Sequence, residues 1–130
     1  MKKCNQPRCE ACPFIVPGKE VSSTFNATSV KINSSLDCDN LNVIYFLFCD
    51  KENCKQIYIG QTQRKLKERL SEHKTSVKHN EKNVVGQHFN GPGHSLEHLK
   101  FTATEKVFHR GQDINLKRES MWINLFEAEV

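Results

Sequence analysis

Five residues of this chain have side chains and an order that suit phosphodiester hydrolysis. That reaction needs an aligned water, a group that takes its proton, and positive charge where the transition state becomes more negative. Tyr45 and Tyr58 can orient or deprotonate the water, and Arg69 can bind the phosphate through its planar set of donors. Glu119 can bind one Mg²⁺ through its carboxylate. His73 follows Arg69 by four residues, and we give it a supporting role.

Each of these residues also has a structural interpretation. Tyrosines in strands are most often amphipathic packing residues. Arg69 can pair with Glu72 or Glu119, and a buried ion pair of this kind would satisfy both side chains without catalysis. Spacing alone therefore leaves both interpretations open.

The elements around the tyrosines have the pattern of a hairpin followed by a helix. Residues 42–49 form an almost continuous apolar run rich in β-branched and aromatic side chains, which predicts a buried central strand. Residues 55–60 are the expected partner strand, joined to it by a turn at 50–53. The two tyrosines would then lie near each other on paired strands.

A basic helix is expected to follow the hairpin. Thr62 can cap it through its hydroxyl, and the helix would extend to residue 78. Its apolar contacts are Leu66, Leu70 and Val77. Arg69 and His73 border this stripe, so they face the sheet. A cation in that position needs a partner or a function.

The later part of the chain completes the expected fold. Residues 84–89 predict a short helix, residues 99–108 a third strand, and residues 113–126 a second long helix. On that helix Glu119 occupies one position of an otherwise apolar stripe. Because an unpaired buried carboxylate is costly, the sequence predicts a metal or an arginine as its partner.

The chain divides into two expected parts. Residues 1–37 form a Cys-rich N-terminal extension, whose first 20 residues we expect to be a loop held by something other than a core. Residues 23–32 permit an extended segment. Residues 38–130 form the predicted domain, an α+β fold with a small antiparallel sheet of about three strands flanked by helices and a zinc-stapled turn.

Clustered cysteines and histidines favour metal binding. Cys49 and Cys54, with His88 and His94, make a Cys2His2 set in which each pair straddles a short turn, as a tetrahedral Zn²⁺ requires. The alternative is a buried strand thiol and a loop histidine. A second possible zinc site has zinc-like spacing in three of its members, while the fourth is distant; its ligands are Cys4, Cys9, Cys12 and Cys38. The alternative there is free thiols on a mobile tail.

The positive charge is concentrated in one segment. Residues 61–82 carry seven Lys or Arg and three acids, which matches the net charge of +4 for the whole chain. Such a segment is typical of a surface that contacts phosphates, although a solvated helix face is the simpler interpretation. The residues that we expect to contact a DNA backbone are Arg64, Lys65, Lys67 and Lys74.

The ordered motifs resemble a known nuclease family. Residues 43–45 (Val-Ile-Tyr), residues 58–60 (Tyr-Ile-Gly), Arg69 and His73 resemble the GIY-YIG nuclease domain. Residues 118–123 resemble the family's Arg-Glu-x-x-Trp-Ile helix. The resemblance covers about residues 38–126 and is strongest to the endonuclease of Penelope-like retroelements, which also has a cysteine pair between its tyrosine motifs.

The resemblance implies a function and a set of residue roles. Both motif tyrosines, Arg69 and Glu119 match the family's catalytic positions, and a single divalent ion, Mg²⁺ or Mn²⁺, serves them. The substrate would be DNA, nicked to leave 3′-hydroxyl and 5′-phosphate ends. The retroelement resemblance further implies a structural Zn²⁺ at the Cys2His2 set. The chain would be a solitary nuclease domain or a piece of a longer retroelement protein.

Two departures keep an alternative function open. Val43 stands where the family name has glycine, and the family usually continues to a polar asparagine that no residue here clearly replaces. The alternative is a catalytically inactive, zinc-stabilised nucleic-acid-binding module of the same fold. A disulfide-linked secreted domain would need a leader, which we do not find. We therefore expect an intracellular, nuclear protein without a membrane span, and the sequence leaves dimerisation open.

Overall fold

The computed structural model describes residues 1–18, 20–22, 29–31, 35–52, 54 and 56–106. The predicted helix at 113–126, with Glu119, lies outside these residues. The elements in chain order are η1 (Cys12–Phe14), β1 (Glu20–Ser22), β2 (Ser29–Lys31), β3 (Val43–Cys49), β4 (Ile57–Thr62), α1 (Leu66–Lys78), α2 (Val84–Phe89), η2 (Leu96–His98) and β5 (Leu99–Lys106).

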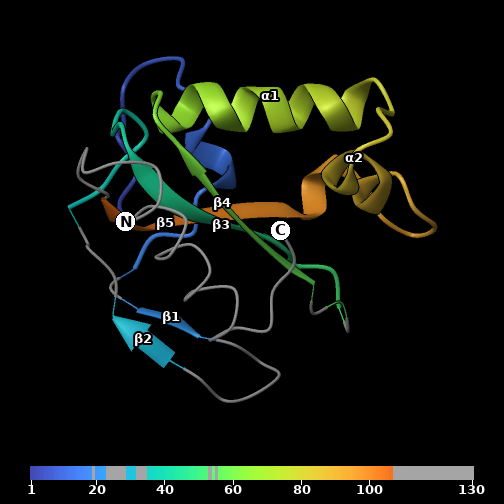
Figure 1. Cartoon of the computed structure of the whole chain (residues 1–130), viewed down its shortest axis with the longest axis horizontal. Coiled ribbons are helices and arrows are strands. Elements are labelled where there is room, and N and C mark those ends of the chain that lie inside the picture. Colours follow the sequence, from blue (N-terminus) through green and yellow to red (C-terminus); the bar gives the residue numbers. More distant parts are fainter. Residues whose placement is uncertain (19, 23–28, 32–34, 53, 55, 107–130) are drawn as a thin grey trace.

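A three-stranded antiparallel sheet is the centre of the described structure. Its strand order is β4-β3-β5, so β3 is the central strand, as its continuous apolar sequence predicts. Residues 43–47 are buried on both faces of the sheet. With α1 and α2 packed beside it, this sheet confirms the predicted α+β fold (Figure 1).

The sheet register brings the two tyrosine motifs to neighbouring positions. Tyr45 pairs with Gly60, and Leu47 pairs with Tyr58. Because side chains alternate along a strand, Tyr45 and Tyr58 share one face of the sheet as a diagonal pair. On the other side of β3, the register with β5 shifts between Ile44 and Tyr45.

Helix α1 covers the face of the sheet that carries both tyrosines (Figure 1). Leu66, Leu70 and Val77 are buried beneath it, as the stripe predicted. The short helix α2 begins and ends at the predicted residues, 84 and 89. In the part of the chain that the structure describes, no helix is both long and apolar enough to cross a membrane.

The predicted ends of β4 and the predicted start of α1 are wrong. Thr62 does not cap α1: it is the last residue of β4, and its hydroxyl accepts from the N–H of Arg64 at 3.2 Å. The helix begins at Leu66 instead. Strand β4 begins at Ile57, not at residue 55, because the turn after β3 is longer than expected and closes with a 3.4 Å hydrogen bond from the N–H of Cys49 to Gln56.

The N-terminal segment is part of the core, contrary to the expectation of a loop held by something else. Met1, Ala11 and Ile15 are buried in the same cluster as the sheet residues. Ile15 forms a parallel bridge with Phe101 of β5, so η1 lies beside β5, and the ring of its Phe14 contacts Lys74 of α1. The predicted extended segment at 23–32 includes β2 at residues 29–31, which pairs with β1; its other residues lie outside the described part of the chain.

Candidate functional site

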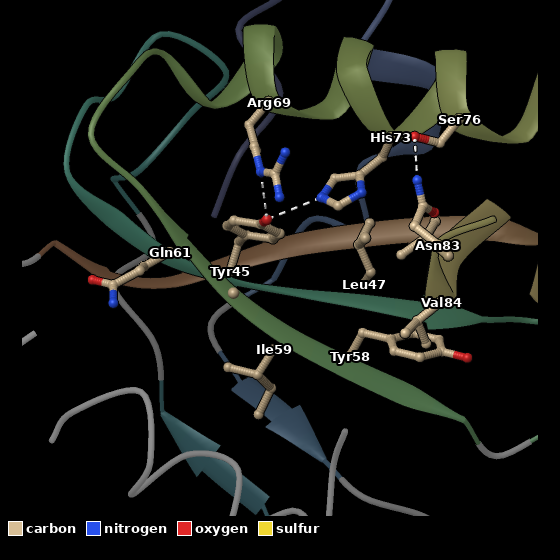
Figure 2. A pocket seen from close by; sticks show the side chains of 12 residues that line it. Tyr45, Leu47, Tyr58, Ile59, Gln61, Arg69, His73, Ser76, Asn83 and Val84 are labelled. Atoms are coloured by element: carbon tan, nitrogen blue, oxygen red, sulfur yellow. Dashed lines mark hydrogen bonds between the residues drawn. The ribbon is translucent and has the colours of Figure 1, made fainter. Parts of the chain in front are cut away.

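The hydroxyl of Tyr45 is the centre of a hydrogen-bonded group between the sheet and α1 (Figure 2). The Nε–H of Arg69 donates to this hydroxyl at 3.0 Å, and Nε2 of His73 lies 2.9 Å from it. Arg69 and His73 are one turn apart on α1, so both reach down to the same strand residue. The structure thus brings together three of the five residues singled out for catalysis.

His73 is neutral in this environment. Its burial, and secondarily the neighbouring Arg69, lower its pKa to about 4. The guanidinium of Arg69 can only donate, so it uses a lone pair of the Tyr45 oxygen. Tyr45 can therefore donate its own proton to Nε2 of a neutral His73, and the three side chains form a directed chain from Arg69 to Tyr45 to His73.

Gly60 is needed for the position of Tyr45. A Cβ atom at residue 60 would lie 2.7 Å from the Tyr45 hydroxyl and 2.8 Å from Cζ of its ring. The tyrosine ring therefore extends across the backbone of β4 at the residue with which it pairs. The glycine of the second motif has a steric role that the sequence pattern alone did not reveal.

A hollow of about 390 Å³ opens beside this group. Arg69 is the one cationic side chain, and no carboxylate occurs, among the described residues that line it. Its wall includes Tyr45, Leu47, Tyr58, Ile59, Gly60, Gln61, Arg69, His73, Ser76, Asn83, Val84 and Val85.

Tyr58 lines the same hollow but has different neighbours. Its ring packs edge-on against His88, with centroids 5.6 Å apart. Its hydroxyl points away from that of Tyr45 (Figure 2). The two tyrosines are near each other, as expected, but their hydroxyls do not converge.

The simple ion-pair interpretation of Arg69 accounts for only part of its contacts. Its NH1 donates to Glu72 at 3.1 Å, as that interpretation expected. Glu72 also pairs with Arg64 and is well exposed, so this is a surface network. The Nε–H of Arg69 is directed at Tyr45 instead, which a surface ion pair does not require.

Sequence reasoning missed a polar group on the far wall of the hollow. Ser76 donates to Glu81 at 2.7 Å and accepts from Nδ2 of Asn83 at 3.0 Å. The Oδ1 atom of Asn83 caps α2 by accepting from the N–H of Gly86 at 2.8 Å. An asparagine before a short helical pattern is an N-cap signal, so the cap, unlike the contact with Ser76, was readable from sequence.

The predicted Cys2His2 residues converge at one end of the sheet. The four possible ligand atoms of Cys49, Cys54, His88 and His94 all lie within 4.8 Å of one another. The Sγ of Cys54 is 3.6 Å from Nε2 of His88, near the ligand separation of about 3.5 Å that a tetrahedral Zn²⁺ site gives. Strand β3 contributes one cysteine, and α2 one histidine.

His94 has the polarity of a metal ligand. Its Nδ1 lies 3.1 Å from the carbonyl of Pro92, which fixes the proton on that nitrogen. Its Nε2 is buried and, among the described residues, lacks a hydrogen-bond partner of good geometry. One ring nitrogen of His94 lies within 4.8 Å of the Sγ of Cys54. A neutral imidazole with one anchored nitrogen and one buried lone pair suits a metal ion.

Both cysteines of this set accept backbone hydrogen bonds. Burial raises the pKa of Cys49 to about 11. The N–H of Lys51, which donates to its sulfur, lowers that pKa but does not outweigh burial. Burial would also raise the pKa of Cys54, but the N–H of Gln56 and the side chain of His94 outweigh it and lower that pKa. In each case the donor is two residues after the cysteine, an arrangement that stabilises a thiolate.

The second predicted set also converges. The sulfurs of Cys4, Cys9, Cys12 and Cys38 lie within 4.8 Å of one another. Cys12 is 3.5 Å from Cys4 and 3.7 Å from Cys38, close to the edge of about 3.8 Å expected for four thiolates around Zn²⁺. We call these four residues the Cys4 cluster. It could hold a metal, and the sequence-distant Cys38 completes it.

Three of the four predicted phosphate contacts have partners within the protein. Arg64 pairs with Glu72, and Lys67 pairs with Asp39 at 2.8 Å. Lys74 donates to the carbonyl of Glu10 at 3.3 Å and lies over the ring of Phe14, so only 12% of its side chain is exposed. Lys67 and Lys74 line a second hollow, formed with residues 6–11. Their role in DNA binding stays a prediction.

Comparison with known proteins identifies the larger part of the chain. The family model of the GIY-YIG catalytic domain matches residues 41–129. No curated protein and no solved structure matches the chain.

Proposed function

Because the chain belongs to the GIY-YIG family of catalytic domains, whose members are nucleases, we propose that it is a divalent-metal-dependent DNA endonuclease. It hydrolyses phosphodiester bonds and cuts one strand per encounter, because the described hollow is a single site. The same reasoning makes double-strand cleavage dependent on a second copy or a second encounter. We further propose a relationship to Penelope-like endonucleases, which the cysteine pair between the tyrosine motifs supports.

The observation that carries this proposal is the position of the Tyr45 hydroxyl. It lies between the donor Nε–H of Arg69 and the acceptor Nε2 of His73, at 3.0 and 2.9 Å, on the wall of an open hollow. A tyrosine used only for packing needs no cation beside its oxygen. A buried neutral histidine at hydrogen-bond distance gives the phenol an acceptor that fixes the direction of its hydroxyl.

These contacts support a sequence of proton transfers. The phenol of Tyr45 ionises by losing its proton to solvent, and the cationic Arg69 stabilises the phenolate, while His73, whose pKa is too low for it to hold the proton, orients the oxygen. The phenolate then takes the proton of a water placed in the hollow, and the hydroxide formed attacks phosphorus. The bond from phosphorus to the 3′ oxygen breaks, and that oxygen takes a proton from solvent. Arg69 also faces the hollow and can stabilise the added charge on the phosphate oxygens. Tyr58, on the opposite part of the wall, would orient the substrate or the water.

We assign the catalytic Mg²⁺ or Mn²⁺ to Glu119 on sequence grounds. Glu119 lies outside the described residues, and those lining the hollow supply no carboxylate. When bound, the ion would stabilise charge on the phosphate oxygens and the leaving group. A separate, structural Zn²⁺ fits the Cys2His2 set, whose buried Nε2 atom of His94 needs a partner.

Nicking of supercoiled plasmid by matched variants tests the proposal. Wild type should nick with Mg²⁺, while Glu119→Ala and Arg69→Ala should lose at least about 100-fold in rate and retain DNA binding. Glu68→Ala and Lys78→Ala are the controls, because they remove a carboxylate and a cation from α1 without touching the hollow. Unchanged nicking in Glu119→Ala and Arg69→Ala would refute the assigned site. DNA binding without nicking by wild type would identify the inactive binding module instead.

A further inference from the structure

Helix α1 begins without a side-chain cap. Its N-cap residue is Lys65, whose side chain makes no capping hydrogen bond. The first N–H groups of a helix have no partner within the helix, so something else must accept from them. Here the N–H of Leu66 donates to the carbonyl of Asn40 at 3.0 Å, and the N–H of Lys67 donates to the carbonyl of Cys38 at 2.9 Å.

The segment that accepts these bonds is held on its other side by the Cys4 cluster. Cys38 is fully buried, and its sulfur is 3.7 Å from that of Cys12. A backbone N–H from Cys4 also donates to the Cys38 sulfur. The same residue therefore offers its carbonyl to α1 and its thiol to the cluster.

The turn between the cluster and the helix is tightly bonded. Asp37 accepts from the N–H of Asp39 at 2.9 Å, and Asn40 accepts from the N–H of Asp37 at 2.8 Å. Asp39 is also 2.8 Å from Nζ of Lys67 on α1. A displacement of Cys38 would therefore be passed to the first turn of α1.

Arg69 lies within that first turn. Its N–H donates to the carbonyl of Lys65, the residue before the helix, and its side chain reaches the Tyr45 hydroxyl. Hydrogen bonds of about 3 Å tolerate little displacement, and a misplacement of about 1 Å can lower a rate about 100-fold. The direction of Arg69 thus depends on where α1 begins.

We propose that the Cys4 cluster binds a Zn²⁺ ion and thereby fixes the start of α1, so that Cys38 is a positioning residue for Arg69. All four cysteines precede residue 41, where the match to the family model begins. The cluster is thus an addition to the catalytic domain. Its effect on catalysis rests on the proposed function, whereas its effect on the helix does not.

Cys9→Ser is the variant that tests the proposal, with Glu10→Ala as an exposed control in the same loop. Zinc content should fall from two ions to one per chain in Cys9→Ser alone. Amide exchange at Leu66 and Lys67 should become at least about tenfold faster, while the amide of Asn90, beside the other metal set, keeps its protection. Metal loss with unchanged exchange at Leu66 and Lys67 would overturn the proposal, as would a wild-type protein that binds only one zinc.

Kinetics separate positioning from general destabilisation. Cys9→Ser should lower kcat about tenfold or more and leave KM for DNA within about twofold. In an Arg69→Lys background the same substitution should change kcat less than about twofold, because the group it positions is already altered. Equal effects in both backgrounds would contradict a route through Arg69. If neither wild type nor any variant nicks DNA, but Cys9→Ser still speeds amide exchange at Leu66 and Lys67, the cluster does fix the start of α1. The proposed nuclease function then fails.

A second pair of variants tests the hydrogen bond from the N–H of Lys67 to the carbonyl of Cys38 while both proposed zinc ions stay bound. Lys67→Pro removes the N–H that donates to Cys38, at a position in the first turn where proline is tolerated. Lys67→Ala keeps that N–H and removes only the side chain. Lys67→Pro should retain two zinc ions and lose kcat about tenfold relative to Lys67→Ala. Equal kcat values would overturn the proposal even if Cys9→Ser does not fold.

Discussion

The two halves of the candidate site are held in place by different chemistry. In the α1 half, Tyr45 is bound by hydrogen bonds to Arg69 and His73. In the α2 half, Tyr58 packs against His88, a member of the Cys2His2 set. Two tyrosines on one face of one hairpin therefore have unequal surroundings, and we infer that the α1 half moves protons while the α2 half shapes the wall.

The Cys2His2 set and the Cys4 cluster also differ in the segments that they join. The Cys2His2 set joins the turn after β3 to the segment after α2, entirely within the matched catalytic domain. The Cys4 cluster joins the N-terminal segment to the start of α1 and lies before that domain. Loss of the first set should damage the fold, whereas loss of the second should damage mainly the alignment of Arg69.

The largest effect is expected from His94→Ala, which removes a ligand whose other nitrogen is already bonded to Pro92. The variant should lose one zinc and about 4 kcal/mol or more of unfolding free energy, because a structural metal contributes directly to folding. Chemical denaturation with zinc analysis measures this, with Cys9→Ser as the comparison. A smaller stability loss in His94→Ala than in Cys9→Ser would reverse the assigned roles.

Gly60→Ala should displace Tyr45 from its contacts with α1, because residue 60 lies on the neighbouring strand of the sheet. The added methyl would meet the Tyr45 hydroxyl at 2.7 Å, so the ring must move away from Arg69 and His73. We expect a stability loss of up to about 3 kcal/mol and a nicking rate at least about tenfold lower, with both zinc ions retained. Gly91→Ala, whose added methyl would meet the carbonyl of His88 at 3.2 Å and lies away from Tyr45, is the glycine comparison on the α2 side. A Gly60→Ala protein that nicks normally would show that the Tyr45 position is not required.

His73 should make stability depend on pH. The unfolded chain binds a proton at this residue below a pH of about 6.5, whereas the folded chain resists it until its pKa of about 4. Unfolding free energy is therefore lost as the pH falls between these values. From pH 7 to about pH 4.5, wild type should lose about 2 kcal/mol more than His73→Gln. Parallel pH dependences in the two proteins would contradict a neutral, buried His73.

The smallest effect is expected from the ion pair between Lys67 and Asp39, both partly exposed. Lys67→Ala should leave the thermal unfolding midpoint almost unchanged, because the backbone bonds to Cys38 and Asn40 remain. Thermal unfolding at low and high salt measures the difference. A large fall in the unfolding midpoint would mean that the side chain, not the backbone, anchors α1.

Local patterns predicted the parts of the site that depend on nearby residues. The β3 sequence identified the central strand, and the apolar stripe of α1 directed Arg69 and His73 toward the sheet. The Cys2His2 residues were recognisable because each pair straddles a short turn. These features follow from periodicity and chain reach, which are visible in sequence.

Features that depend on distant backbone atoms were not predictable. Helix α1 starts at Leu66 because carbonyls of Cys38 and Asn40 accept its first N–H groups, and no local side chain encodes this. The partner of Lys74 is likewise 64 residues away, at Glu10. Burial of Met1 in the core could not be inferred from a polar, Cys-rich segment.

The most direct test of the account is the nicking rate of Tyr45→Phe on supercoiled plasmid with Mg²⁺, measured beside wild type under conditions where both are zinc-loaded. The substitution removes one oxygen that contacts Arg69 and His73 and leaves the packed ring in place. Wild type should nick, and Tyr45→Phe should bind DNA equally well but nick at least about 100-fold more slowly. Nicking by Tyr45→Phe at the wild-type rate would contradict the proposed role of the Tyr45 hydroxyl.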